Sequence, residues 1–198
     1  MKRIILYMAM LVMSVWGALA ATPRELLAGA AEKLSKAASV SATFTMRTDN
    51  GQVRGSMQMA GRSFALTAGE LSMWYDGKTQ WVYSVTSGEV NVSVPDADEL
   101  VESNPFMLLS GYQTRFNIAS GGADTAVLTP KNKAVSDISK AVIMFGKNGW
   151  PHKITVTFGS GASAVVTIGS ITMGKTLPAA TFRFDPRKYP EAEIIDLR

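Results

Sequence analysis

The stretch Ser72-Met73-Trp74-Tyr75-Asp76-Gly77-Lys78-Thr79-Gln80-Trp81-Val82-Tyr83 decides the fold, because two aromatic-rich runs flank the dipeptide Asp76-Gly77. An Asp-Gly pair between two such runs is a strong signal for a β-hairpin with a two-residue turn. A turn of that length would place Trp74 opposite Thr79.

Side-chain alternation sorts the apolar residues of this hairpin onto two faces. One face carries Trp74, Trp81 and Tyr83, and the other carries Leu71, Met73, Tyr75 and Val82. Both faces are therefore apolar, and neither can be left in water. We expect further strands and short helices to cover them.

Period-two alternation recurs along the chain and predicts eleven or twelve strands. They fall near residues 40–47, 53–59, 63–67, 71–75, 79–85, 90–94, 112–118, 125–129, 141–145, 154–158 and within 162–173, with a terminal apolar segment at 194–195. Their short spacing without a linker indicates one mainly β unit with short helices (α+β), either a strongly bent antiparallel sheet or an incomplete β-barrel.

Three helical segments interrupt this pattern. Thr22-Pro23-Arg24-Glu25 has the form of a capping box and predicts a helix over 23–37. Acidic residues at 96–103 suit the first turn of a second helix. Asn104-Pro105 begins a third at 105–110, where four large apolar residues follow and Gly111 ends the helix. A short helix this apolar must enter a core or cover an apolar opening.

Residues 1–20 have the form of a secretory signal peptide: Lys2 and Arg3, an apolar run, and the small-residue site Ala18-Leu19-Ala20. The alternative is an uncleaved membrane anchor, but the run is at the short end for a spanning helix. We expect cleavage after Ala20, an exported protein, and one domain over 21–198.

Composition excludes several classes of function. The formal charge is +4 for the whole chain and +2 without Lys2 and Arg3, and its scattered basic residues do not suggest nucleic-acid binding. The absence of Cys excludes disulfides and a thiolate nucleophile.

The sequence contains no recognisable catalytic constellation. His152 is the one histidine, lies at the start of a strand, and is better interpreted as structural than as catalytic or metal-ligating. The acidic group Asp96, Asp98, Glu99 and Glu102 matches no Ca²⁺ loop, and a helix start accounts for it. We therefore expect no enzyme, no cofactor and no metal.

Methionine is the more informative residue. Seven of the 11 methionines follow residue 20. Methionine can simply fill gaps in a core, but its flexible thioether also suits surfaces that accommodate variable apolar ligands. Together with a bent sheet and an apolar short helix, it supports the hypothesis of an apolar ligand cavity.

An ordered set of motifs resembles the LolA family of periplasmic outer-membrane lipoprotein carriers. Asp76-Gly77-Lys78 with Trp81 and Tyr83 resembles the family's D-G-K-x-x-W-x-Y, and Asn104 to Leu109 resembles its x-P-F-x-L-L. Further matches are Val40 to Thr45, Leu128 to Lys131, Phe182 to Pro186 and Ile195 to Arg198. The resemblance covers nearly all of residues 21–198 in order.

The resemblance implies an incomplete antiparallel barrel of about eleven strands with a helical lid over a hydrophobic cavity. It implies a monomeric periplasmic carrier that accepts acylated lipoproteins from an inner-membrane ATP-driven releasing complex and passes them to an outer-membrane acceptor. On this interpretation the residues that contact acyl chains are Phe44, Met57, Met59, Trp74, Trp81, Tyr83, Phe106, Met107, Leu108 and Leu109.

The resemblance also implies a basic residue that latches the barrel to the lid, and Arg62 is the match. The family usually has Arg-Pro there, whereas this chain has Arg62-Ser63 and a shorter loop, so a solvated turn arginine is the alternative. Two other functions stay open: a carrier of another lipid or glycolipid, and a periplasmic sensor that binds a lipoprotein or other amphiphile and contacts a membrane regulator.

Overall fold

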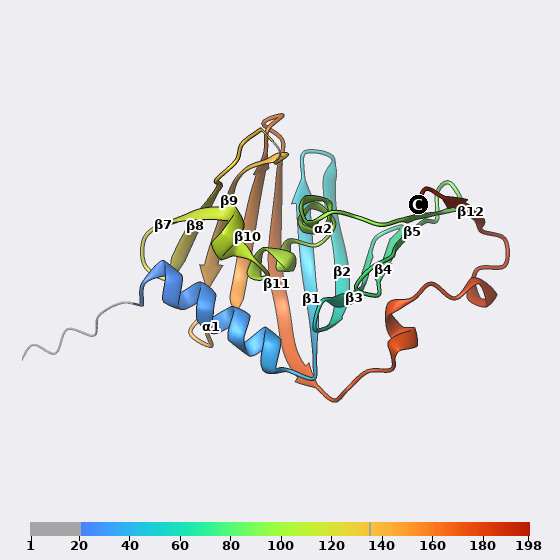
Figure 1. The fold of residues 1–198 in the computed structure, drawn as a ribbon, viewed down its shortest axis with the longest axis horizontal. Coiled ribbons are helices and arrows are strands. Elements are labelled where there is room, and N and C mark those ends of the chain that lie inside the picture. The colour runs from blue at the N-terminus through green and yellow to red at the C-terminus, as the bar shows by residue number, and fades with distance from the viewer. Residues whose placement is uncertain (1–20, 135) are drawn as a thin grey trace, which may run out of the picture.

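The computed structural model describes residues 21–134 and 136–198, without the side chains of Asp98 and Glu102. The predicted signal peptide lies outside the described residues. Twelve strands form one open sheet in the order β12-β6-β5-β4-β3-β2-β1-β11-β10-β9-β8-β7 (Figure 1). All neighbours pair antiparallel except β12, which runs parallel to β6.

The described strands have these bounds: β1 Ser39–Thr48, β2 Gly51–Ala60, β3 Ser63–Ala68, β4 Leu71–Tyr75, β5 Gln80–Ser84, β6 Glu89–Ser93, β7 Phe116–Ser120, β8 Thr125–Pro130, β9 Ile138–Phe145, β10 Pro151–Phe158, β11 Ser163–Gly174 and β12 Glu193–Asp196. The helices are α1 Pro23–Lys36, α2 Ala97–Ser103, α3 Tyr112–Arg115 and the short 3₁₀ segments η1 Pro105–Leu109, η2 Ala179–Phe182 and η3 Pro186–Lys188.

Helix α1 begins where the capping box predicts. The Thr22 hydroxyl accepts from the Glu25 amide at 3.3 Å, and the Glu25 carboxylate accepts from the Thr22 amide at 2.7 Å. Its apolar stripe, Leu27, Ala30 and Leu34, is buried. Figure 1 shows the helix lying across the half of the sheet that contains β7–β11.

The hairpin β4–β5 confirms the two predicted faces and corrects the turn. Tyr75 pairs with Gln80 and Trp74 with Trp81, so the loop has four residues rather than two. The Asp76 carboxylate explains the longer loop, because it accepts hydrogen bonds from the Lys78 and Thr79 amides at 3.1 and 2.9 Å. The register moves by two residues, which leaves each side chain on its predicted face.

Two strand predictions need smaller corrections. The strand expected from Tyr112 begins only at Phe116, because 112–115 form the helix α3. The strands expected within 162–173 are one long strand, β11.

The main core lies between α1, the lid and one face of the sheet, here called the inner face. "Lid" denotes residues 97–109, that is α2 and η1. Figure 1 shows α2 in front of β1 and β2. Leu100, Val101 and all four apolar residues of η1 are buried, so the lid is part of the core.

Candidate functional site

An apolar cavity of about 420 Å³ lies between the inner face of the sheet and η1. This volume falls in the lower part of the usual range for ligand sites, about 300–1,000 Å³. Its lining comprises Phe44, Met46, Val53, Met57, Leu66, Ala68, Gly69, Glu70, Leu71, Met73 and Val166 from the sheet, and Ser103, Asn104, Pro105 and Phe106 from the lid. Glu70 is the one charged residue in this lining.

Strand register explains why the lining is apolar. Met57 pairs with Leu66, which pairs with Met73, so three flexible or branched side chains form a row across β2, β3 and β4. The next row runs from Phe44 through Gly55 to Ala68. Gly55 and Ala68 in this second row are small, so space remains beside the larger side chains of the first row.

Gly55 is required by the geometry of this second row. A Cβ atom built on it would lie 2.3 Å from the Phe44 ring and 2.5 Å from the carbonyl oxygen of Thr67. The Phe44 side chain therefore lies directly over the Gly55 backbone, and this contact positions its ring at the cavity wall.

The lid closes the cavity with a capped 3₁₀ turn. Asn104 caps η1 by accepting a hydrogen bond from the Phe106 amide through Oδ1 at 3.1 Å. Pro105 follows at the first helical position, where its missing N–H costs nothing. The lid thus presents Phe106 to the cavity, while Leu108 is fully buried in the core.

Arg115 connects the lid to α3. Its guanidinium donates to the carbonyl oxygen of Ala97, at the start of α2, at 2.9 Å. Burial lowers the pKa of Arg115, and the nearby Asp96 carboxylate opposes that shift, so the side chain keeps its charge at neutral pH. This hydrogen bond spans the lid, from the residue that begins α2 to the helix after η1.

Arg62, the predicted latch, is exposed and lies in a shallow hollow with Ala97, Leu100, Met107 and Arg115. Within residues 21–134 and 136–198 no hydrogen bond from Arg62 to the lid is observed. The latch role of Arg62 stays a prediction. Sequence reasoning did not single out Arg115, a basic residue that closely follows the apolar short helix and bonds to the start of α2.

Only part of the predicted acyl-contact set lines the cavity. Phe44, Met57 and Phe106 do so. Met59, Leu108 and Leu109 are buried in the core outside the lining, and Met107 lines the hollow beside Arg62 instead. The helical period explains this result, because consecutive residues of η1 cannot all face one cavity.

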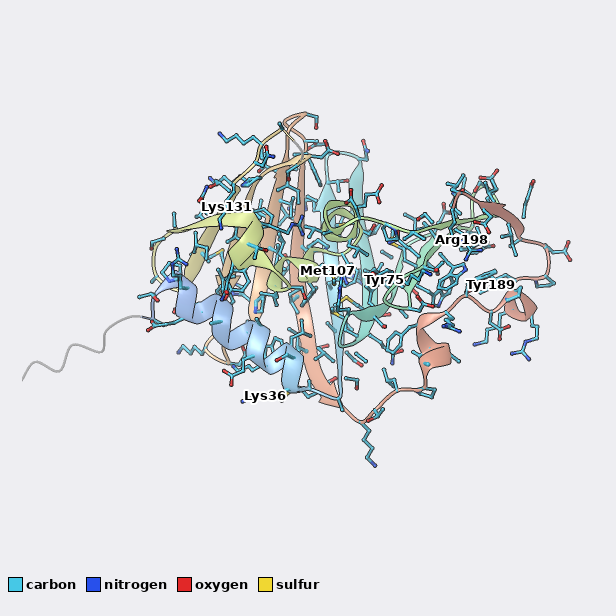
Figure 2. The ribbon with its side chains drawn as sticks, viewed as in Figure 1. Lys36, Tyr75, Met107, Lys131, Tyr189 and Arg198 are labelled. Atoms are coloured by element: carbon cyan, nitrogen blue, oxygen red, sulfur yellow. The ribbon has the colours of Figure 1, made fainter. Side chains whose placement is uncertain are left out.

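The prediction that Trp74, Trp81 and Tyr83 line the cavity is wrong. Trp74 and Trp81 pair on the outer face of the sheet, and Tyr83 shares that face. There the C-terminal segment contacts two of them: the Tyr189 ring lies 5.7 Å from Trp74 and 4.7 Å from Tyr83, measured between centroids. Figure 2 shows Tyr189 on that segment, away from Met107 near the middle of the molecule.

We call Trp74, Tyr83, Phe184 and Tyr189 the outer aromatic cluster. Phe184 lies 5.6 Å from Trp74 and 5.3 Å from Tyr189 between centroids. Arg183, next to it, donates to the Asp76 carboxylate at 3.1 Å. Both faces of the β4–β5 hairpin are apolar and need to be covered. The outer aromatic cluster and this ion pair cover the outer face.

Sequence reasoning missed Met46, Val53, Leu66, Leu71, Met73 and Val166 as lining residues. A signal existed for three of them. Leu71 and Met73 share the second face of the hairpin. Met46 likewise shares the parity of Phe44 in β1. The sequence did not show which face of the hairpin turns toward the cavity.

The described residues contain no group of three or more His, Asp or Glu side chains placed to hold a metal ion. His152 is exposed on β10. In the part of the chain that the structure describes, no helix is long and apolar enough to cross a membrane.

A known family matches the lid and part of the sheet that lines the cavity. The family "Outer membrane lipoprotein carrier protein LolA" matches residues 67–185, which include β4–β5, the lid and most of the strands after it. The chain belongs to the LolA family. No curated protein matches it significantly in sequence.

Solved structures are similar to this chain at low sequence identity. An uncharacterized conserved protein from Thermus thermophilus has a TM-score of 0.55 at 13% identity and shows the same fold, with the match covering 87% of this chain and 98% of that protein. For a LolA superfamily protein from Nitrosomonas europaea the TM-score is 0.46 at 12% identity, covering 83% of this chain and 99% of that protein. For an outer membrane lipoprotein-sorting protein domain from Vibrio parahaemolyticus the TM-score is 0.45 at 14% identity, covering 82% and 96%.

Proposed function

We propose that this LolA-family protein binds the acyl chains of lipoproteins in the lid-covered cavity and carries them through the periplasm. It would receive them from an inner-membrane ATP-driven releasing complex and pass them to an outer-membrane acceptor, as a monomer and without covalent chemistry. The observation that carries the proposal is an apolar cavity bounded by soft methionines and a short helical lid in a chain of this family.

Partial burial of an acyl chain suits a carrier that must release its cargo. Burial of about ten methylenes would contribute about 8 kcal/mol, since each is worth about 0.8 kcal/mol. That gross energy corresponds to a Kd of about 1 μM before the cost of association is subtracted. Full burial of two or three long chains would exceed the practical ceiling near 20 kcal/mol and prevent transfer.

Leu71 provides the sharpest test, because it lines the cavity and is 39% exposed, so a charge there need not unfold the protein. Met173 on β11 is an apolar residue away from the cavity, with 64% exposure, and serves as the matched control. Leu71→Asp would place a carboxylate at the cavity wall, whereas Met173→Asp would place one in water. Leu108, by contrast, is fully buried, and an Asp there would report on folding.

The experiment adds purified residues 21–198 to spheroplasts and measures acylated lipoproteins in the supernatant. We expect release by the wild type and Met173→Asp, and little release by Leu71→Asp. Equal release by both variants would contradict the role of the cavity. Absence of release, with another lipid found by mass spectrometry of the purified protein, would favour a lipid or glycolipid carrier, and hydrolysis of ester substrates would contradict a carrier without chemistry.

A further inference from the structure

Asn104 carries a polar group that the fold leaves unsatisfied beside the cavity. The residue is fully buried and belongs to the cavity lining. Its side-chain nitrogen Nδ2 is buried and has no hydrogen-bond partner in the described structure. A buried donor without a partner is costly, so its retention at this position calls for an explanation.

The orientation of the amide is fixed by the cap. Oδ1 accepts from the Phe106 amide, which is a donor and cannot pair with an NH₂ group. A flipped amide would place two donors against each other, so Nδ2 must be the atom on the other side. The backbone groups of Asn104 are also in use: its N–H donates to Leu100 at 2.9 Å, and its carbonyl accepts from Met107 at 2.9 Å.

No atom of the described cavity lining accepts a hydrogen bond from Nδ2. Most of its lining is aliphatic, aromatic or thioether, and the carboxylate of Glu70 accepts from the Thr86 hydroxyl. A ligand that brings its own acceptor would supply the missing bond. Long-chain acyl esters and amides have an apolar tail, which suits the row formed by Met57, Leu66 and Met73, and one carbonyl acceptor.

We propose that the Asn104 side-chain amide donates a hydrogen bond to the ligand's acyl carbonyl oxygen when the cavity is filled. Because Nδ2 is buried in the present arrangement, the carbonyl reaches it when η1 moves outward. This inference rests on the proposed function, since it assumes that the cavity is the acyl site.

The test compares methyl decanoate with undecane, which have similar tails but differ in the carbonyl. Binding to residues 21–198 is measured by displacement of a fluorescent hydrophobic probe, for wild type and Asn104→Ser. Serine keeps a capping oxygen for η1 but removes the NH₂ group, and its shorter side chain holds its own hydroxyl at the cap rather than at the position of Nδ2. We expect the substitution to weaken methyl decanoate about tenfold more than undecane, equivalent to about 1.4 kcal/mol.

A second measurement on the wild type protects against a folding defect in the variant. In ¹⁵N-labelled protein the Asn104 side-chain NH₂ resonance should shift with methyl decanoate and much less with undecane. Equal weakening of both ligands, or an NH₂ resonance that responds equally to both, would overturn the donor role while leaving the cavity proposal intact. If neither ligand displaced the probe from the wild type, the cavity proposal would be overturned and this one with it.

Discussion

Replacement of Gly55 by alanine tests how the cavity wall is built. The added methyl group would meet the Phe44 ring at 2.3 Å and the Thr67 carbonyl oxygen at 2.5 Å. The ring could rotate away, but the carbonyl belongs to the neighbouring strand β3 and can move only with its backbone. Rotation of Phe44 would also send the ring into the cavity.

Overpacking of this kind costs about 1–3 kcal/mol. Because one of the two contacts is with backbone, we expect about 3 kcal/mol for Gly55→Ala. For a protein of this size each kcal/mol lowers Tm by about 2–4 °C, which gives a decrease of about 6–12 °C. Ligand binding should weaken in the same variant, because its ring partly fills the site.

Gly29→Ala is the matched control, since a Cβ on Gly29 meets nothing within 4 Å. Gly29 lies inside α1, where alanine is favoured over glycine by up to about 1 kcal/mol. The two glycine substitutions should therefore shift Tm in opposite directions in calorimetry. A Gly55→Ala variant with unchanged Tm and unchanged ligand affinity would refute the close-contact reasoning.

Three further predictions concern other parts of the fold. Burial raises the pKa of Asp76, but two backbone N–H groups of its own loop and Arg183 outweigh this effect, so the pKa is lowered overall. The ionised carboxylate therefore stabilises the fold at pH values above its unfolded-state pKa near 3.9, and this stabilisation is lost as the pH falls through the lower folded-state pKa. Urea unfolding should thus show a small cost for Arg183→Gln at pH 7, below about 1 kcal/mol, which disappears in acid, and a cost that persists in acid would count against this origin. Tyr189→Ala should lower the free energy of unfolding by about 2 kcal/mol and expose the C-terminal segment to proteolysis, whereas Tyr189→Phe should leave the segment protected. Equal proteolysis of both variants would show that ring contacts do not hold the segment. Thr22→Ala should lower the free energy of unfolding by about 1 kcal/mol through loss of the α1 cap, and an unchanged urea midpoint would contradict that role.

Local patterns predicted the elements of this fold well. The capping box at Thr22 and the Asn104-Pro105 start of η1 involve residues that are neighbours in sequence, so their geometry follows from short-range chemistry. The two faces of the β4–β5 hairpin were also predicted correctly, because a register change of two residues preserves side-chain parity. The turn itself was wrong, since the Asp76 carboxylate stabilises a longer loop.

The cavity was harder to predict, because its location depends on contacts distant in sequence. Trp74 and Met73 are adjacent residues on opposite faces, and both are plausible acyl contacts. The choice between them is made by Tyr189, more than a hundred residues later, which packs on Trp74 and leaves Met73 to the cavity. No periodicity within the hairpin carries that information.

Two features of the site depart from the usual rules for protein interiors. Protein interiors are closely packed and their polar groups are paired, yet here an apolar cavity adjoins the unpaired Nδ2 of Asn104. Such departures are expected where a protein is built for function. A single ligand with an apolar tail and a carbonyl would relieve both at once, so ligand binding should also stabilise the fold, by RT ln(1 + [L]/Kd). An alkane would fill the cavity but leave the amide unpaired, and for that reason the two defects are more economically explained by one acylated ligand than by separate causes.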